Sequence, residues 1–226
     1  MKKILIFAAH PDDELLGCGA TILKLKKKGF KVKTFFFGDG ESSRKKNKKT
    51  IFKSITIREK QALEVSKKAG FEKPGFQRLP DNKLDSVPLL DIVKFIEKQI
   101  KLNKPEIVFT HFENDLNIDH HHTFFSTFVA CRPNNSFFVK KLLSFEIPSS
   151  TDWGISYNNK NFCPNYFVDI NKFLKKKLKL LDCYKFEMRK APHPRSIKNI
   201  KALSNYRGGI VGVENAEAFI VNKIIV

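Results

Sequence analysis

The sequence has no hydrophobic run long enough to cross a lipid bilayer, which takes about 20 consecutive apolar residues. Its N-terminal apolar stretch, residues 4–9, follows two lysines as in a secretory signal but is only six residues long. A signal peptide needs about 7–15 apolar residues and a small-residue cleavage site, whereas this stretch runs directly into His10. We therefore predict a buried strand here, no transmembrane segment and a cytoplasmic protein.

Closely spaced cysteines and arginines are also scarce. The four cysteines are widely scattered with no Cys-x-x-Cys spacing, which argues against a thiolate metal site and favours reduced thiols. Only seven of the 42 basic residues are arginine, the side chain that best recognises phosphates and bases. Despite the net charge of +19, we therefore predict no specific nucleic-acid binding. The charge could still attract an anionic substrate, such as a nucleotide- or lipid-linked sugar.

Strand-like and helix-like segments alternate through the first half of the chain. A polar, lysine-rich stretch without periodicity, residues 39–54, predicts a loop or a mobile flap. The alternation predicts an α/β fold of Rossmann-like type, a mostly parallel sheet with helices on both faces and the site at the carboxyl ends of its strands. Strands are expected at residues 3–9, 31–37, 76–79 and 106–111, and helices at 14–28, 57–70 and 86–101.

The second half of the chain is less regular. No internal repeat and no linker divides the sequence, so we predict one domain over residues 1–226. A helix is expected at residues 119–130, strands at 142–147 and 166–170, a long basic helix at 171–189 and a closing strand at 218–226.

Residues 9–14, Ala-His-Pro-Asp-Asp-Glu, place an imidazole and adjacent carboxylates at the junction of a predicted strand and helix. Burying two adjacent like charges is costly unless something compensates them, and a divalent cation would do so. A second cluster, residues 115–122, contains His120, His121 and His122. One of these imidazoles would complete a His-Asp-His set, and three protein ligands leave a fourth position open, as in catalytic zinc sites.

The chain resembles the PIG-L/LmbE family of zinc-dependent N-acetylglucosamine-type deacetylases over nearly its whole length. The family's Ala-His-Pro-Asp-Asp-Glu signature is present without a change, Arg58-Glu59 opens the second helix, and an Asp-His pair stands in the second metal segment. The reaction implied is hydrolysis of the N-acetyl group of an amino sugar or a glycoconjugate precursor, with release of acetate.

The resemblance also implies a role for each motif residue. His10, Asp13 and His120 would bind the metal, with His121 and His122 as less favoured alternatives. Asp12 would be the general base that takes a proton from the zinc-bound water. Asp119 would orient a metal-site imidazole. Zinc is the metal expected, although a His/carboxylate set also accepts Fe²⁺, Co²⁺ or Mn²⁺.

The sequence departs from the family pattern at Asn117. Many members place a histidine three residues before the last zinc ligand, where it stabilises the oxyanion. An amide can donate a hydrogen bond to an oxyanion, but it cannot act as a general acid near neutral pH. Asp12 would then serve as base and acid in turn, or His111 or Tyr166 would take the missing role.

Substrate contacts are expected from Arg58, which could bind a hydroxyl or phosphate, although a structural ion pair explains this arginine equally well. His193, in the rigid Pro-His-Pro-Arg segment 192–195, could line the substrate mouth, which in a homo-oligomer could be that of a neighbouring subunit. An ordinary exposed loop is the simpler interpretation of this segment. Two other functions keep the same motifs. They are an amidase acting on a non-sugar or thiol-glycoside conjugate, and a basic nucleic-acid-binding protein with a vestigial metal site. The complete set of metal and base residues favours the deacetylase over a mere binder.

Overall fold

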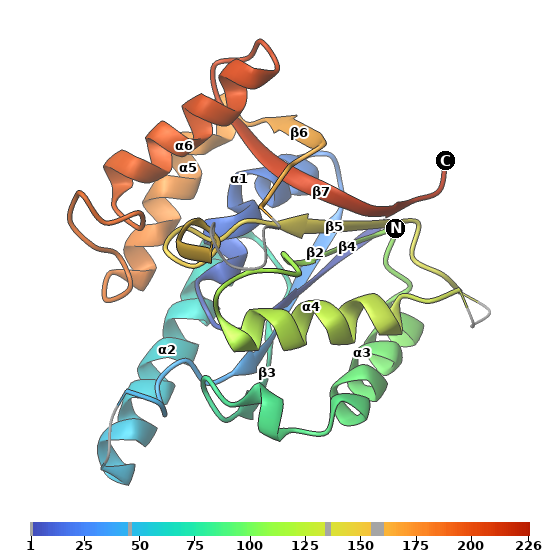
Figure 1. Cartoon of the computed structure of the whole chain (residues 1–226), viewed down its shortest axis with the longest axis vertical. Coiled ribbons are helices and arrows are strands. Elements are labelled where there is room, and N and C mark those ends of the chain that lie inside the picture. Colours follow the sequence, from blue (N-terminus) through green and yellow to red (C-terminus); the bar gives the residue numbers. More distant parts are fainter. Residues whose placement is uncertain (1, 45–46, 134–136, 155–160) are drawn as a thin grey trace.

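In the computed structural model, which describes residues 2–44, 47–133, 137–154 and 161–226, a seven-stranded sheet runs through the molecule (Figure 1). Its strand order is β3-β2-β1-β4-β5-β7-β6. The first five strands pair in parallel, whereas β7 pairs antiparallel with both β5 and β6. The predicted mostly parallel α/β sheet is therefore confirmed. The strands are β1 (Lys3–Ala8), β2 (Lys31–Gly38), β3 (Gly75–Leu79), β4 (Ile107–His111), β5 (Lys141–Phe145), β6 (Tyr166–Asp169) and β7 (Ala216–Ile224).

The helices cover both faces of this sheet. On one face, α1, α2, α5 and α6 share a core with Ile4 and Ile6 of β1, and on the other α3 and α4 share a core with Leu5 and Phe7. Successive strand residues point to opposite faces, so the uniformly apolar β1 is buried on both. No helix in the described part of the chain is both long and apolar enough to span a membrane. The helices are α1 (Asp13–Lys27), α2 (Lys48–Ala69), α3 (Leu89–Asn103), α4 (Ile118–Ala130), α5 (Asn171–Leu181) and α6 (Ile197–Ile210).

The predicted loop over residues 39–54 was wrong in its length. α2 begins at Lys48, well before the expected start at residue 57. Asn47 caps this helix, because its side chain accepts a hydrogen bond from the Lys49 backbone N–H (2.9 Å). The first turns of α2 are mostly exposed, so they carry little of the apolar periodicity that reveals a helix in a sequence.

The predicted long helix over residues 171–189 was also wrong. α5 ends at Leu181, and a 3₁₀ turn, Asp182–Tyr184, follows it. Tyr184 turns into the core, where its hydroxyl donates to Glu14 Oε1 (2.9 Å). The helix α6 was missed altogether. It begins after Ser196, whose side chain accepts from the Asn199 N–H (3.2 Å), and its glycines near the C-terminal end obscure the pattern.

Candidate metal centre

The turn between β1 and α1 carries three of the candidate residues. β1 ends at Ala8 and α1 begins at Asp13, so the chain reverses over a very short segment. Asp12 adopts a φ of +129°, a conformation that L residues rarely take and keep only where the surroundings hold it. The His10 backbone N–H donates to Asp13 Oδ2 (2.8 Å), and this bond closes the turn. His10, Asp12 and Asp13 are thereby placed at the carboxyl end of β1.

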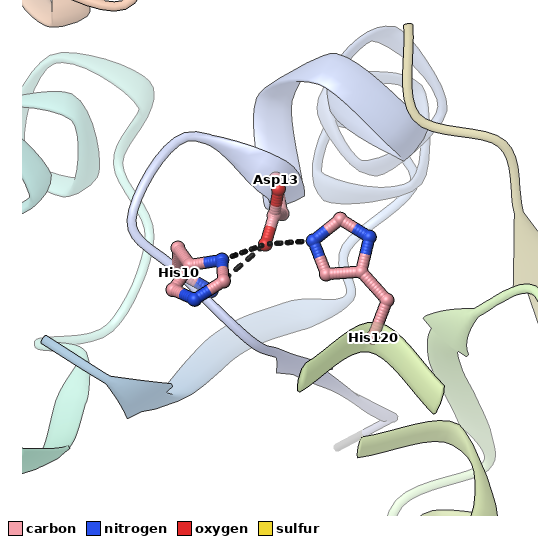
Figure 2. A group of neighbouring side chains, drawn as sticks. All are labelled: His10, Asp13 and His120. Atoms are coloured by element: carbon pink, nitrogen blue, oxygen red, sulfur yellow. Dashed lines mark hydrogen bonds and ion pairs between the residues drawn. The ribbon is translucent and has the colours of Figure 1, made fainter. Parts of the chain in front are cut away.

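His10, Asp13 and His120 come together from two distant segments of the chain (Figure 2). Asp13 Oδ2 lies 3.7 Å from His10 Nδ1 and 3.5 Å from His120 Nε2. One ligand atom of each residue lies within 4.8 Å of the other two. With metal–ligand bonds of about 2.1 Å, ligand atoms at tetrahedral angles are about 3.4 Å apart, so this spacing suits a single ion.

The second ring nitrogen of His10 is held by two carboxylates. Nε2 lies 2.9 Å from Asp119 Oδ2 and 3.1 Å from Asp81 Oδ1. A proton on Nε2 satisfies both and leaves the Nδ1 lone pair facing Asp13. Burial by itself would lower the pKa of His10, but the hydrogen bonds to Asp119 and Asp81 raise it to about 10. The surroundings of His10 therefore favour positive charge, which a bound cation would supply in place of the second ring proton.

Asp115 holds the second ring nitrogen of His120, as Asp119 and Asp81 hold that of His10. Its Oδ1 lies 3.0 Å from His120 Nδ1, which leaves Nε2 facing Asp13. Asp115 is fully buried, and it accepts hydrogen bonds from the hydroxyls of Ser150 and Thr151 and from the Asn117 backbone N–H. Metal-binding histidines commonly donate their second N–H to such a carboxylate, which sets the tautomer and the orientation of the ring.

One buried oxygen of the group, Asp13 Oδ1, has no hydrogen-bond partner among the described residues. A buried carboxylate oxygen without a partner is costly, and a cation would compensate it. Two imidazoles with free lone pairs and one carboxylate are a donor set that suits Zn²⁺ and also Fe²⁺, Co²⁺ or Mn²⁺. The residues present therefore fit a divalent cation.

His10, Asp81 and Asp119 form a second group whose ligand atoms lie within 4.8 Å of one another. The oxygens of this group already have protein donors. Asp119 accepts from the backbone N–H groups of Asn82 (2.7 Å) and Leu84 (3.0 Å), and Asp81 accepts from the Ser43 hydroxyl. We therefore interpret the two carboxylates as supports for His10 rather than as ligands of a second ion.

The other histidines near the group have contacts of their own, although His111 Nε2 also lies 3.5 Å from Asp13 Oδ2. His111 Nε2 accepts from the Ala9 backbone N–H (2.8 Å), and burial lowers the pKa of His111 well below its usual value. The neutral His111 ring is thus unsuited to the missing acid role. His121 Nε2 contacts the Asp115 carbonyl oxygen, and His122 belongs to neither group of candidate ligands within the described residues.

Asn117 caps α4. Its Oδ1 accepts from the Asp119 N–H (2.8 Å), and its Nδ2 donates to Asn82 Oδ1 (3.2 Å). An amide nitrogen has two hydrogens, so one remains for another acceptor. Tyr166, considered for the same role, has its hydroxyl 3.4 Å from Lys141 Nζ at the amino end of β5. Tyr166 lies on the edge strand β6, which β5 and β7 separate from β4, and no contact among the described residues joins it to the candidate ligands.

The Asp12 carboxylate faces two arginines. Arg195 Nη1 donates to Asp12 Oδ2 (2.9 Å), and Arg58 Nη1 lies 3.9 Å from the same oxygen. Burial raises the pKa of Asp12 to about 6, although the charges of Arg195 and Arg58 oppose this shift. A carboxylate whose pKa is close to neutral is suited to accepting and returning a proton.

Arg58 lies within a buried ion cluster. It is 3% exposed, and its guanidinium contacts Glu187, Glu41 (3.1 Å) and the Pro11 carbonyl oxygen (3.3 Å). Arg44 binds the same Glu187 through both Nη atoms (2.8 and 3.0 Å). These contacts favour a structural ion pair over a direct substrate contact for Arg58.

His193 lies beside an exposed tryptophan. The edge of its ring meets Trp153, with 5.4 Å between ring centroids, and its Nδ1 accepts from the Arg195 backbone N–H (3.1 Å). Trp153 is 58% exposed. The exposed Trp153 and the half-buried His193, next to the arginine that holds Asp12, offer an apolar surface near the site.

Sequence reasoning missed four residues that complete the site: Asp81, Asp115, Glu187 and Arg195. Asp115 and Arg195 lie in segments that the motifs had already marked. Asp81 follows the carboxyl end of β3, a position that could have drawn attention to it. Glu187 carries no local signal, because it follows a helix end that the sequence did not reveal.

A family model described as GlcNAc-PI de-N-acetylase, of the PIG-L family, matches residues 5–131, more than half of the chain. The chain belongs to the PIG-L family. An Escherichia coli (strain K12) protein described as the uncharacterized deacetylase YaiS is 29% identical over 154 residues, which cover 66% of this chain and 76% of that protein.

Two solved structures show how widely this PIG-L fold is used. N,N′-diacetylchitobiose deacetylase from Pyrococcus horikoshii has a TM-score of 0.78 at 22% identity, over 97% of this chain and 83% of that chain. GalB, the 4-carboxy-2-hydroxymuconate hydratase from Pseudomonas putida KT2440, has a TM-score of 0.78 at 19% identity, over 100% of this chain and 98% of that chain. Because a hydratase shares the fold, the function of this PIG-L protein has to be argued from its site residues.

Proposed function

We propose that this PIG-L protein is a metal-dependent N-deacetylase, which hydrolyses the N-acetyl group of an amino sugar or glycoconjugate precursor and releases acetate. One observation carries the proposal. The group of His10, Asp13 and His120, accompanied by Asp12, occurs in a chain whose family model is described as GlcNAc-PI de-N-acetylase.

His10 Nδ1, the Asp13 carboxylate and His120 Nε2 would hold the cation, which we take to be Zn²⁺, with Fe²⁺, Co²⁺ or Mn²⁺ as alternatives. Such an ion lowers the pKa of water and polarises a carbonyl oxygen. Asp119 and Asp115 keep the two imidazoles in the tautomers that leave these nitrogens free for the ion.

Asp12 is the proposed general base. Because Arg195 occupies Asp12 Oδ2, Oδ1 is the oxygen available for a proton. It accepts the proton of the water that attacks the acetamide carbonyl carbon. His111 Nε2 accepts from the Ala9 N–H and so has no proton to donate. Asp12 Oδ1 therefore delivers its proton to the amine nitrogen as the carbon–nitrogen bond breaks. Asp12 thus acts as base and acid in turn.

Asn117 Nδ2 is the proposed donor to the carbonyl oxygen as it becomes an oxyanion. The amide carries a second hydrogen besides the one given to Asn82. Its position at the start of α4 keeps it three residues from His120 and next to Asp119. The cap and the donor role use different atoms of one side chain, so they are compatible.

The sugar is proposed to lie between the aromatic pair Trp153–His193 and a cavity of about 360 Å³ that reaches Asp81, a neighbour of His10. Ser42 and Ser43 line this cavity and are suited to sugar hydroxyl groups. Lys83 also lines it and would meet the phosphate of a nucleotide- or lipid-linked carrier.

The test measures acetate release and metal content on the same purified protein. The panel holds N-acetylglucosamine in free, nucleotide-linked and lipid-linked form, beside a non-sugar acetamide and a thiol-glycoside conjugate. We expect acetate and free amine in equal amounts from a sugar substrate, loss of release on chelation and recovery on adding zinc. Asp13→Asn is the matched inactive control. If the metal-loaded protein releases acetate from no sugar amide, the proposal is wrong.

A further inference from the structure

Arg195 and the Asp12 carboxylate meet although 183 positions separate them in the sequence. Arg195 Nη1 donates to Asp12 Oδ2 (2.9 Å), and within the described residues no other hydrogen bond reaches that carboxylate. Arg58 is farther away, at 3.9 Å, and donates to the Pro11 carbonyl oxygen instead. The position of the Asp12 side chain therefore depends on Arg195 more than on any other group.

Arg195 is itself held along its whole length. Its Nε donates to the Pro148 carbonyl oxygen (3.2 Å) and to Ser149 Oγ (2.9 Å). Its backbone N–H donates to His193 Nδ1 (3.1 Å), and the residue after it, Ser196, caps α6. A planar guanidinium bound at both ends has little freedom left, so it can transmit a fixed position to its partner.

The turn that binds the Nε of Arg195 also supports the candidate ligands His10, Asp13 and His120, called the metal group below. Ser150 and Thr151, directly after Ser149, donate their hydroxyls to Asp115. Asp115 in turn holds His120 Nδ1 (3.0 Å). One side chain thus joins Asp12 to the turn that fixes a candidate metal ligand, and the base and the ligand share a common support.

We propose that Arg195 is a positioning residue, which fixes Asp12 Oδ2 relative to the metal group and leaves Oδ1 free for the proton. The backbone of Asp12 supports this assignment, since a residue at φ +129° keeps that conformation only where its surroundings hold it. The expected fall in kcat without Arg195 rests on the proposed deacetylase function, whereas the expected displacement of the Asp12 carboxylate does not.

Kinetics of Arg195→Ala and Arg195→Lys test the assignment. We expect Arg195→Ala to lower kcat about 10²-fold, the size of effect that a displacement of about 1 Å produces, with KM and bound metal close to wild type. Arg195→Lys keeps a positive charge but not the two-ended binding, so it should restore only part of kcat. Arg207→Ala is the matched control, because Arg207 lies on α6, the helix that follows Arg195, and likewise holds a carboxylate, Glu146, through two bonds (2.8 and 2.7 Å). Its kcat should stay near wild type.

Crystal structures of the wild type and of Arg195→Ala give a readout that needs no substrate. In the variant, the Asp12 carboxylate should move or occupy two positions, while His10, Asp13 and His120 keep theirs. An unmoved Asp12, or an equal loss of kcat in Arg207→Ala, overturns the proposal. If the wild type hydrolyses no N-acetyl sugar, the proposed function fails, and the two crystal structures still decide what Arg195 does.

Discussion

Residues 5–131, which the PIG-L family model matches, and the residues that follow them contribute to the site in different ways. The first part supplies the metal group, and short-range contacts place it: the His10 N–H binds Asp13, and Asn117 caps the helix that carries His120. The second part supplies contacts from outside, such as the Arg195 bond to Asp12. The candidate ligands and their supporting carboxylates thus lie in the first region, and the second region adds Arg195, which holds Asp12 from a distant part of the chain.

Charge is also arranged differently at the site and on α5. The site arginines are paired with carboxylates, as Arg58 is with Glu187 and Glu41. On α5, in the second part, four of the five lysines are exposed. The net charge of +19 therefore says little about the site. The following predictions test the division of roles, from the largest expected effect on activity to the smallest.

Replacing Asp13 by Asn should abolish metal binding. The substitution keeps the size of the side chain but removes the one carboxylate that faces both imidazoles. We expect bound metal and acetate release to fall to background together, as measured by elemental analysis and an acetate assay. His122→Gln is the neighbouring control and should keep both. Full metal content in Asp13→Asn would mean that the ion is bound elsewhere.

Replacing Asp12 by Asn should separate binding from turnover. The metal group is intact, so bound metal should stay at the wild-type level, while loss of the general base lowers kcat by about 10²–10⁴-fold. Elemental analysis and steady-state kinetics on one sample measure both. The opposite result, metal lost with normal turnover per remaining ion, would exchange the roles of Asp12 and Asp13.

Two substitutions of Asn117 should separate its cap from its donor. Asn117→Ser keeps a good capping residue but removes the amide, so stability should hold while kcat falls by roughly 10²–10³-fold. Asn117→Ala loses both, with a further cost of about 0.5–2 kcal/mol in unfolding free energy. Denaturant unfolding and kcat per bound metal give the two readings. Wild-type kcat in Asn117→Ser would leave Asn117 as a cap alone.

Asp115→Asn and Ser150→Ala compare the two parts of the chain directly. Loss of the carboxylate that orients His120 should weaken metal affinity by about 10–100-fold, measured by competition with a chelator. Ser150 gives Asp115 one of several hydrogen bonds, so Ser150→Ala should weaken affinity less. A larger effect from Ser150→Ala than from Asp115→Asn would show that the second part does more for metal binding than align Asp115.

Lys177→Met should destabilise the fold with little effect on the site. Lys177 Nζ lies 2.7 Å from Glu217 Oε1 and donates to the Leu16 carbonyl oxygen (2.8 Å), behind the irregular part of α1. Removing one partner of a buried ion pair costs about 3–5 kcal/mol. Denaturant unfolding should show this loss, with kcat per folded molecule unchanged. Lys176→Ala, exposed on the same helix, should stay within about 0.5 kcal/mol of wild type.

The sequence by itself determined the mostly parallel sheet, most of its helices and the position of the two candidate metal segments. Uniformly apolar strands such as β1 must be buried on both faces, and the carboxyl ends of parallel strands meet at one edge. A histidine and two aspartates directly after β1 therefore had to lie at that edge. Asn117, three residues before His120, was identified instead from the resemblance to the PIG-L/LmbE family, many of whose members place a histidine there.

Only the tertiary structure decided which groups support these residues. Asp81, Asp115 and Arg195 act through contacts that depend on strand order and on the paths of loops, which hydrophobic periodicity does not specify. The tertiary structure also placed Tyr166 on the edge strand β6, with β5 and β7 between it and β4, and buried Arg58 in an ion cluster. A charged residue in a polar loop carries the same local signal whether it faces water or a buried partner, because the partner is distant in sequence. The alignment of the site was for this reason visible only in the folded chain.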